Sequence, residues 1–172
     1  MAVDEKELLH GEDARQKVQE LLETFPIAFM ITLVNGELTA RPIGIVGGTS
    51  KFDGTLWFIT DKRSRKVAAI EAGALTTLLF QNDKEGSYLQ LAGRASVIDD
   101  RAKLEELYTT LQRTWFPKGV DDPDITLVRF DATEANYWDS HDSYVRLAAA
   151  FVKSVATGSP GKSGNAGVAK LS

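Results

Sequence analysis

Apolar and polar positions alternate along most of this chain in short runs, which predicts a succession of strands with a few amphipathic helices. Residues 13–25 carry apolar side chains at helical spacing and end before a proline, so they are expected to form a helix. Residues 27–34 and 38–46 predict two strands joined by an Asn-Gly turn, the strongest short hairpin signal. Pro42 indicates that the second of these strands lies at a sheet edge or contains a bulge.

The remaining pattern predicts an antiparallel barrel. Further strands are expected over 55–60, 74–80, 88–98 and 125–130, and short helices over 64–72 and from 99 to Leu111. Gly93 lies inside a strand pattern, which suggests a bulge or a close backbone approach. Hairpins or single short helices join these strands, so the fold class is mainly β, a β-barrel with peripheral helices.

The end of the chain differs in composition from the rest. Residues 144–156 are expected to form a helix, and the sequence then becomes small and polar, ending in GSPGKSGNAGVAKLS. We therefore expect one domain over residues 1–156 and a flexible tail over residues 157–172.

Composition narrows the classes of function. The 172 residues are 43% apolar and 26% charged, with a net charge of −4, which gives no basic footprint for nucleic acid or an anionic membrane. The chain has no cysteine, so thiolate chemistry and disulfides are excluded. No signal peptide or apolar run of spanning length is apparent, so a cytoplasmic location is expected. His10 and His141 are not spaced as metal ligands, so they are interpreted as surface residues and no metal site is expected.

The densest group of chemically active side chains is Thr60-Asp61-Lys62-Arg63-Ser64-Arg65-Lys66, at a strand-to-helix junction. Unpaired N–H groups at a helix start, two hydroxyls and several cations are suited to a phosphate monoester. The alternative is a solvated turn capped by Asp61 or Ser64. Arg41, in strand alternation with Thr39 and Ile43, is a second candidate, which either meets an anionic partner or extends to water.

Taken together, Ala40-Arg41-Pro42-Ile43 and the run from Trp57 to Lys66 resemble the pyridoxamine 5′-phosphate oxidase-like superfamily. The resemblance implies an FMN-binding split barrel that works as a homodimer, whose second copy completes the wall of the flavin site. The residues that it assigns to the FMN phosphate are Arg41, Thr60, Ser64, Arg65 and Lys66. It also places the backbone around Pro42, Ile43 and Ile59 beside the flavin ring. Trp138 would contact the partner's flavin or act as a core anchor.

Two further features indicate which branch of the superfamily this chain resembles. Trp115-Phe116-Pro117-Lys118-Gly119, Asp122-Pro123 and Tyr137-Trp138-Asp139 resemble the bacterial general stress proteins. Trp115 and Phe116 either pack in the core or dimer interface, or cover the flavin. In the true oxidase, an Arg-Leu-His-Asp-Arg segment contributes to binding the substrate. In this chain the corresponding segment, after Trp138, is DSHDSYVRLAAA. Oxidation of pyridoxamine phosphate is therefore not expected.

Three functions remain open from the sequence. The first is an FMN-dependent oxidoreductase that takes electrons from a nicotinamide or small organic donor, with the cofactor carrying the chemistry. The second is a stress protein that binds or sequesters flavin without turnover, and the third is an interaction module without flavin. No catalytic acid, base or nucleophile is assigned. FAD, a deazaflavin or haem in the same pocket also remain open.

Overall fold

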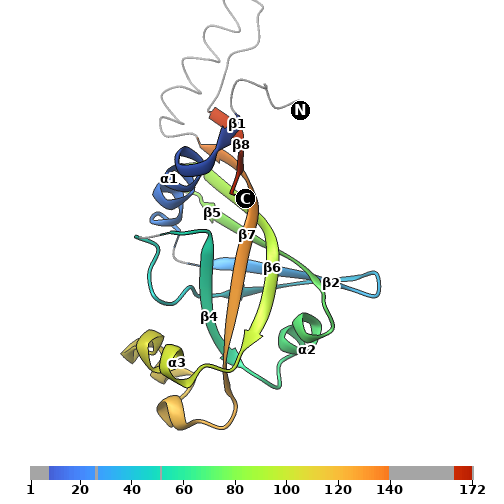
Figure 1. Cartoon of the computed structure of the whole chain (residues 1–172), viewed down its shortest axis with the longest axis vertical. Coiled ribbons are helices and arrows are strands. Elements are labelled where there is room, and N and C mark those ends of the chain that lie inside the picture. The colour runs from blue at the N-terminus through green and yellow to red at the C-terminus, as the bar shows by residue number, and fades with distance from the viewer. Residues whose placement is uncertain (1–7, 26, 51, 140–164, 172) are drawn as a thin grey trace, which may run out of the picture.

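The computed structural model describes residues 8–25, 27–50, 52–139 and 165–171, and one mixed sheet dominates them (Figure 1). The sheet has eight strands in the order β1-β8-β7-β6-β5-β2-β3, and β4 pairs with β7. The strands are β1 Leu8–His10, β2 Ala28–Val34, β3 Glu37–Ile43, β4 Thr55–Asp61, β5 Leu75–Asn82, β6 Ser87–Ile98, β7 Ile125–Asp139 and β8 Asn165–Lys170. The prediction of a mainly β fold is confirmed.

The β2–β3 hairpin forms at the predicted Asn-Gly turn. Asn35 and Gly36 both adopt positive φ, 51° and 81°, as a tight hairpin between right-twisted strands requires. Pairing of Val34 with Glu37 fixes the register of the whole hairpin. β3 lies at the end of the sheet order, so the edge position expected from its proline is confirmed.

The sheet closes on itself into a barrel. β7 is antiparallel to β6 along most of its length, with the predicted irregularity between Ala92 and Gly93. The first half of β7 also pairs with β4. A single antiparallel bridge between Val46 and Trp57 then joins the chain beyond β3 to β4. The strands thereby enclose a space that only side chains fill.

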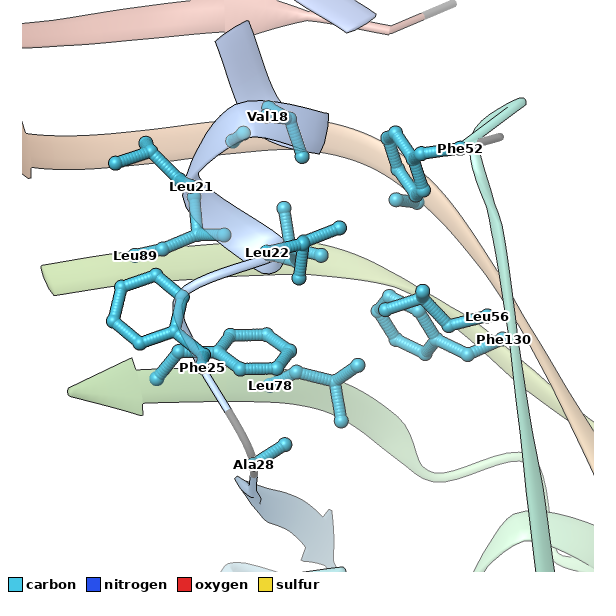
Figure 2. Close-up of a cluster of buried hydrophobic side chains, with 14 of the residues drawn as sticks. Val18, Leu21, Leu22, Phe25, Ala28, Phe52, Leu56, Leu78, Leu89 and Phe130 are labelled. Carbon is cyan, nitrogen blue, oxygen red and sulfur yellow. The ribbon is translucent and has the colours of Figure 1, made fainter. Parts of the chain in front are cut away.

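One apolar core fills the barrel and extends beneath the N-terminal helix. The helix α1, Gly11–Leu22, buries Ala14, Val18, Leu21 and Leu22 on one face. Figure 2 shows Leu22 directed toward Leu56 and Phe130 of the barrel, and Leu21 beside Leu89. Burial of this stripe holds the helix on the sheet, as its periodicity predicts.

Two short helices flank the barrel. The helix α2, Arg65–Glu71, follows β4 directly and packs against β2 and β6. The helix α3, Arg101–Leu107, begins after Asp100, whose side chain accepts a hydrogen bond from the Lys103 amide at 2.9 Å. The prediction that this helix continues to Leu111 is wrong. A 3₁₀ turn, Thr110–Thr114, starts there because Thr109 and Gln112 form a new capping box.

The prediction of a flexible tail over residues 157–172 is also wrong for its last part, residues 165–170. Residues 165–170 form β8, which is antiparallel to β7 and parallel to β1. Ala169 and Leu171 are buried in the core, and Arg15 of α1 donates to the Leu171 carbonyl at 3.4 Å. Pairing with β7 and β1 therefore outweighs the tail-like composition of these residues. The helix expected over 144–156 lies outside the described residues.

Among the described residues, no helix is long and apolar enough to cross a membrane. The same residues contain no group of three or more histidine, aspartate or glutamate side chains arranged around a common point.

Candidate functional site

The candidate phosphate site, defined as Arg41, Thr60, Ser64, Arg65 and Lys66, is assembled from β3, β4 and the start of α2. The bridge between Val46 and Trp57 is antiparallel, so the chain before Val46 runs beside the chain after Trp57. This arrangement brings the end of β3 toward the end of β4.

Arg41 lies on the barrel-facing side of β3. Its Nη1 donates to Thr32 Oγ1 at 3.0 Å, and its Nη2 donates to Thr39 Oγ1. The two hydroxyls also share a hydrogen bond of 3.1 Å. Burial lowers the pKa of Arg41 from its ordinary value, but a guanidinium stays protonated at neutral pH. Arg41 is thus half-buried and held by two neutral hydroxyls, and it has no anionic partner among the described residues.

The turn between β4 and α2 is held by contacts on two sides. Thr60 is buried at the end of β4, and Asp61 Oδ1 accepts a hydrogen bond from the Arg63 amide at 2.7 Å. The Lys62 amide donates to the Asp124 carbonyl at 2.8 Å, and Arg63 Nη2 lies 2.7 Å from Asp124 Oδ2. The turn therefore has a fixed backbone even though its charged side chains are exposed.

Ser64 precedes α2 in the N-cap position but its side chain makes no capping bond. Its Oγ is buried and has no hydrogen-bond partner among the described residues. A buried hydroxyl without a partner costs free energy. Ser64 therefore does not cap the turn, but Asp61 does, because its Oδ1 accepts the hydrogen bond from the Arg63 amide. The hydrogen-bonding capacity of the Ser64 hydroxyl is left unused among the described residues.

Lys66 gives the site its second half-buried cation. Burial is the largest cause that lowers the pKa of Lys66, the positive charge of Arg41 lowers it further, and Asp61 partly offsets both. Within the described part of the chain, Arg41, Arg65 and Lys66 form no ion pair with a carboxylate at 4.0 Å or less. Two cations that repel each other, and that Asp61 offsets only in part, create a local positive potential suited to an anion.

The other predicted residues occupy different places. Ile43 is buried in the main core, and Pro42 is exposed on the edge strand. Ile59 packs with Val46 and Leu127 in a second, smaller cluster near α3. Their backbone role beside a ring stays a prediction.

Trp138 is not brought to the phosphate site within one chain. It pairs with Tyr88 on β6, and both side chains are about 40% exposed on the outside of the sheet. They line a groove of about 330 Å³ with Phe29 and Leu79. Since Arg41 contacts the fully buried Thr32, the two groups lie on opposite faces of the sheet.

Sequence reasoning missed Thr32 and Asp124. Thr32 carried a usable signal, because the Asn-Gly turn fixes the hairpin register and places Thr32 opposite Thr39, next but one to Arg41. Asp124 lies 60 or more residues away from the turn it fixes, in a loop whose acids look like ordinary turn residues. No local pattern could have identified it.

Comparisons with known proteins agree with this architecture. A family model described as "Pyridoxamine 5′-phosphate oxidase like" matches residues 13–161. Protein bli-3 of Neurospora crassa is 26% identical over 113 residues, covering 61% of this chain. That match spans about half, 54%, of the length of the curated relative.

Solved structures are similar over most of the chain. A protein related to general stress protein 26, from Clostridium acetobutylicum, has a TM-score of 0.65 at 27% identity, covering 74% of this chain and 89% of that one. A general stress FMN/FAD binding protein from Xanthomonas citri has a TM-score of 0.64 at 23% identity, covering 77% and 92%. The latter similarity establishes the shared fold.

Proposed function

This chain belongs to the pyridoxamine 5′-phosphate oxidase-like family and has its split-barrel fold, and we propose that it binds FMN. One observation carries the proposal: the buried, unpartnered Ser64 hydroxyl lies in a site whose cations Arg41 and Lys66 form no ion pair with a carboxylate among the described residues. A phosphate monoester would satisfy the hydroxyl and neutralise the cations at once.

The residues present fit such a group. Arg41 keeps three of its five N–H donors after bonding the two threonines, and Lys66 adds three more. Thr60 and Ser64 add hydroxyls from the two ends of a fixed turn. The mutual repulsion of the two cations is relieved when an anion binds, so the arrangement favours a dianionic ligand over a neutral one.

We further propose that the protein is a flavin-dependent oxidoreductase that uses a nicotinamide or a small organic electron donor. FMN supplies the redox chemistry when it is bound. The chain's own residues then have to hold the phosphate, orient the ring and control access to it. A flavin-binding stress protein without turnover is the alternative, and the protein from Xanthomonas citri described as FMN/FAD binding is consistent with either.

Titration of the purified protein with FMN, FAD and riboflavin tests the binding proposal. Each charge-assisted contact to phosphate is typically worth about 1.5–3 kcal/mol, so FMN is expected to bind at least about 100-fold more tightly than riboflavin. Equal affinities would contradict the phosphate site, and no binding of either would favour an interaction module. Consumption of NADH or NADPH with an artificial acceptor then separates turnover from sequestration.

We also propose a homodimer built on the outer apolar face, defined as Phe29, Leu33, Leu75, Leu79, Tyr88 and Trp138. These exposed side chains meet as cross-strand pairs on β2, β5, β6 and β7. A group of exposed apolar side chains on one sheet face typically marks an interface. In a two-fold dimer on this face, each copy would cover Trp138 of the other.

A further inference from the structure

The contacts of Arg41 contain a feature that phosphate binding alone does not explain. The guanidinium donates to the hydroxyls of Thr32 and Thr39, which are also bonded to each other at 3.1 Å. Thr32 is fully buried and Thr39 is half-buried. We call these two residues the hydroxyl pair. Arg41 and the pair form a closed ring of three side chains on the β2–β3 hairpin.

The hydroxyl pair fixes the position of Arg41 without neutralising its charge, whereas an acidic residue would do both. A partly buried arginine needs acceptors for its N–H groups, and a carboxylate is its usual partner. A carboxylate would fix the side chain but would also cancel its charge and compete with an anionic ligand. Two neutral hydroxyls accept the hydrogen bonds and fix the rotamer, and they leave the positive charge available.

These hydrogen bonds restrict the movement of the Arg41 side chain. Both terminal nitrogens of Arg41 are held, so the side chain cannot swing away from the barrel without losing two hydrogen bonds. Arg41 therefore stays close enough to Lys66 for its charge to lower the pKa of that residue. A long side chain that is already ordered loses less entropy when a ligand binds.

We propose that Thr32 and Thr39 are positioning residues that hold Arg41 for the phosphate and determine preference for a phosphorylated flavin over the dephosphorylated one. This role rests on the proposed FMN site and adds to it the residues that tune its specificity. The hydroxyl pair acts through Arg41 and has no contact of its own with the ligand.

The central experiment removes one hydroxyl without changing the side-chain volume. In Thr32→Val, FMN affinity is expected to fall about tenfold, while riboflavin affinity changes less than twofold. Thr32→Ser keeps the hydroxyl and should restore FMN binding. The matched control is Thr76→Val, because Thr76 is the buried neighbour of Thr32 on β5 and donates to the Ala74 carbonyl at 3.2 Å instead. That control should leave the ratio of FMN to riboflavin affinity unchanged.

A second experiment tests the requirement for a neutral acceptor. Thr39 is half-exposed, so the protein should accommodate both Thr39→Asp and Thr39→Asn. The two variants differ in charge at one position. The aspartate is expected to weaken FMN binding about tenfold more than the asparagine and to leave riboflavin binding alike in both.

The outcomes separate the two proposals. Unchanged FMN affinity in Thr32→Val, or an equal loss of FMN and riboflavin affinity, overturns the positioning role and leaves the flavin site standing. Equal affinities of the aspartate and asparagine variants for FMN also overturn it. A native protein that binds FMN and riboflavin equally refutes the phosphate site, and the positioning role fails with it.

Discussion

Lys66 and Arg41 place two positive charges close together in one site, which costs stability when no anion is bound. Burial and the charge of Arg41 both lower the pKa of Lys66, so the fold disfavours the protonated lysine. Such local conflict with stability is common at binding sites, where a ligand later provides the compensation.

Replacing Lys66 with methionine should therefore separate stability from binding. Removing the cation is expected to stabilise the ligand-free protein at neutral pH by less than about 1 kcal/mol, because the half-buried ammonium is partly screened by water. The same change should weaken FMN binding roughly 10- to 100-fold. Thermal denaturation and FMN titration measure the two effects. A variant that is less stable and binds FMN normally would contradict both assignments.

The lowered pKa of Lys66 also predicts how FMN binding depends on pH. Phosphate needs the protonated ammonium, so affinity should decrease as pH rises through the lysine's lowered pKa, below the ordinary 10.5. Over the interval from that pKa to 10.5, the ligand-free protein should gain stability, because the unfolded chain binds the additional proton. Lys66→Arg stays charged, so titrations at increasing pH should show no such loss of affinity in that variant.

Individual residues of the site could be predicted from the sequence to very different degrees. Arg41 and Lys66 were candidates because they lie in two short motifs that resemble those of the pyridoxamine 5′-phosphate oxidase-like superfamily. Thr32 could have been derived from the hairpin register. Asp124 could not, because its contact with Arg63 forms only when two distant loops meet in the folded barrel.

At the scale of secondary structure elements, the irregularity in β6 at Gly93 brings this strand very close to β7. A Cβ atom at Gly93 would lie 2.2 Å from the Asp131 carbonyl oxygen and 2.7 Å from the Phe130 ring. Gly93→Ala is thus expected to cost about 1–3 kcal/mol in unfolding free energy. Gly44→Ala is the control, because nothing lies within 4 Å of its Cβ and it should change stability by less than about 0.5 kcal/mol. Urea denaturation compares the two variants. Equal stabilities would show that β7 can move away from the added methyl group and would contradict this prediction.

Elements that depend on local signals were predicted well, and those that depend on distant partners were not. The β2–β3 hairpin follows from its Asn-Gly turn alone. β7 continues to Asp139, well beyond the predicted end at Phe130, because β6 and β8 pair with its second half. β8 itself has a composition typical of a tail and becomes a strand only because β7 and β1 flank it.

At the scale of the whole molecule, the candidate phosphate site and the outer apolar face lie on opposite sides of the sheet. The candidate phosphate site is reached from the inner side of β3, whereas Trp138 belongs to the outer apolar face. Leu75 on this face is 74% exposed, which is a large apolar area to leave in water. A two-fold arrangement of copies would cover the face and yield two equivalent flavin sites.

A charge placed in the middle of the outer apolar face should therefore prevent dimerisation. Leu79 pairs directly with Phe29, so Leu79→Glu would bury a carboxylate between two apolar surfaces, at a cost of several kcal/mol. Sedimentation should show about twice 18.8 kDa for the native protein and 18.8 kDa for the variant. Leu111→Glu is the matched control, because Leu111 is 65% exposed but lies in the 3₁₀ turn after α3, away from that face. If the Leu79 variant remains a dimer, the interface lies elsewhere. If the native protein is a monomer with full FMN affinity, the flavin site is complete in one chain, and a partner's Trp138 has no part in flavin binding.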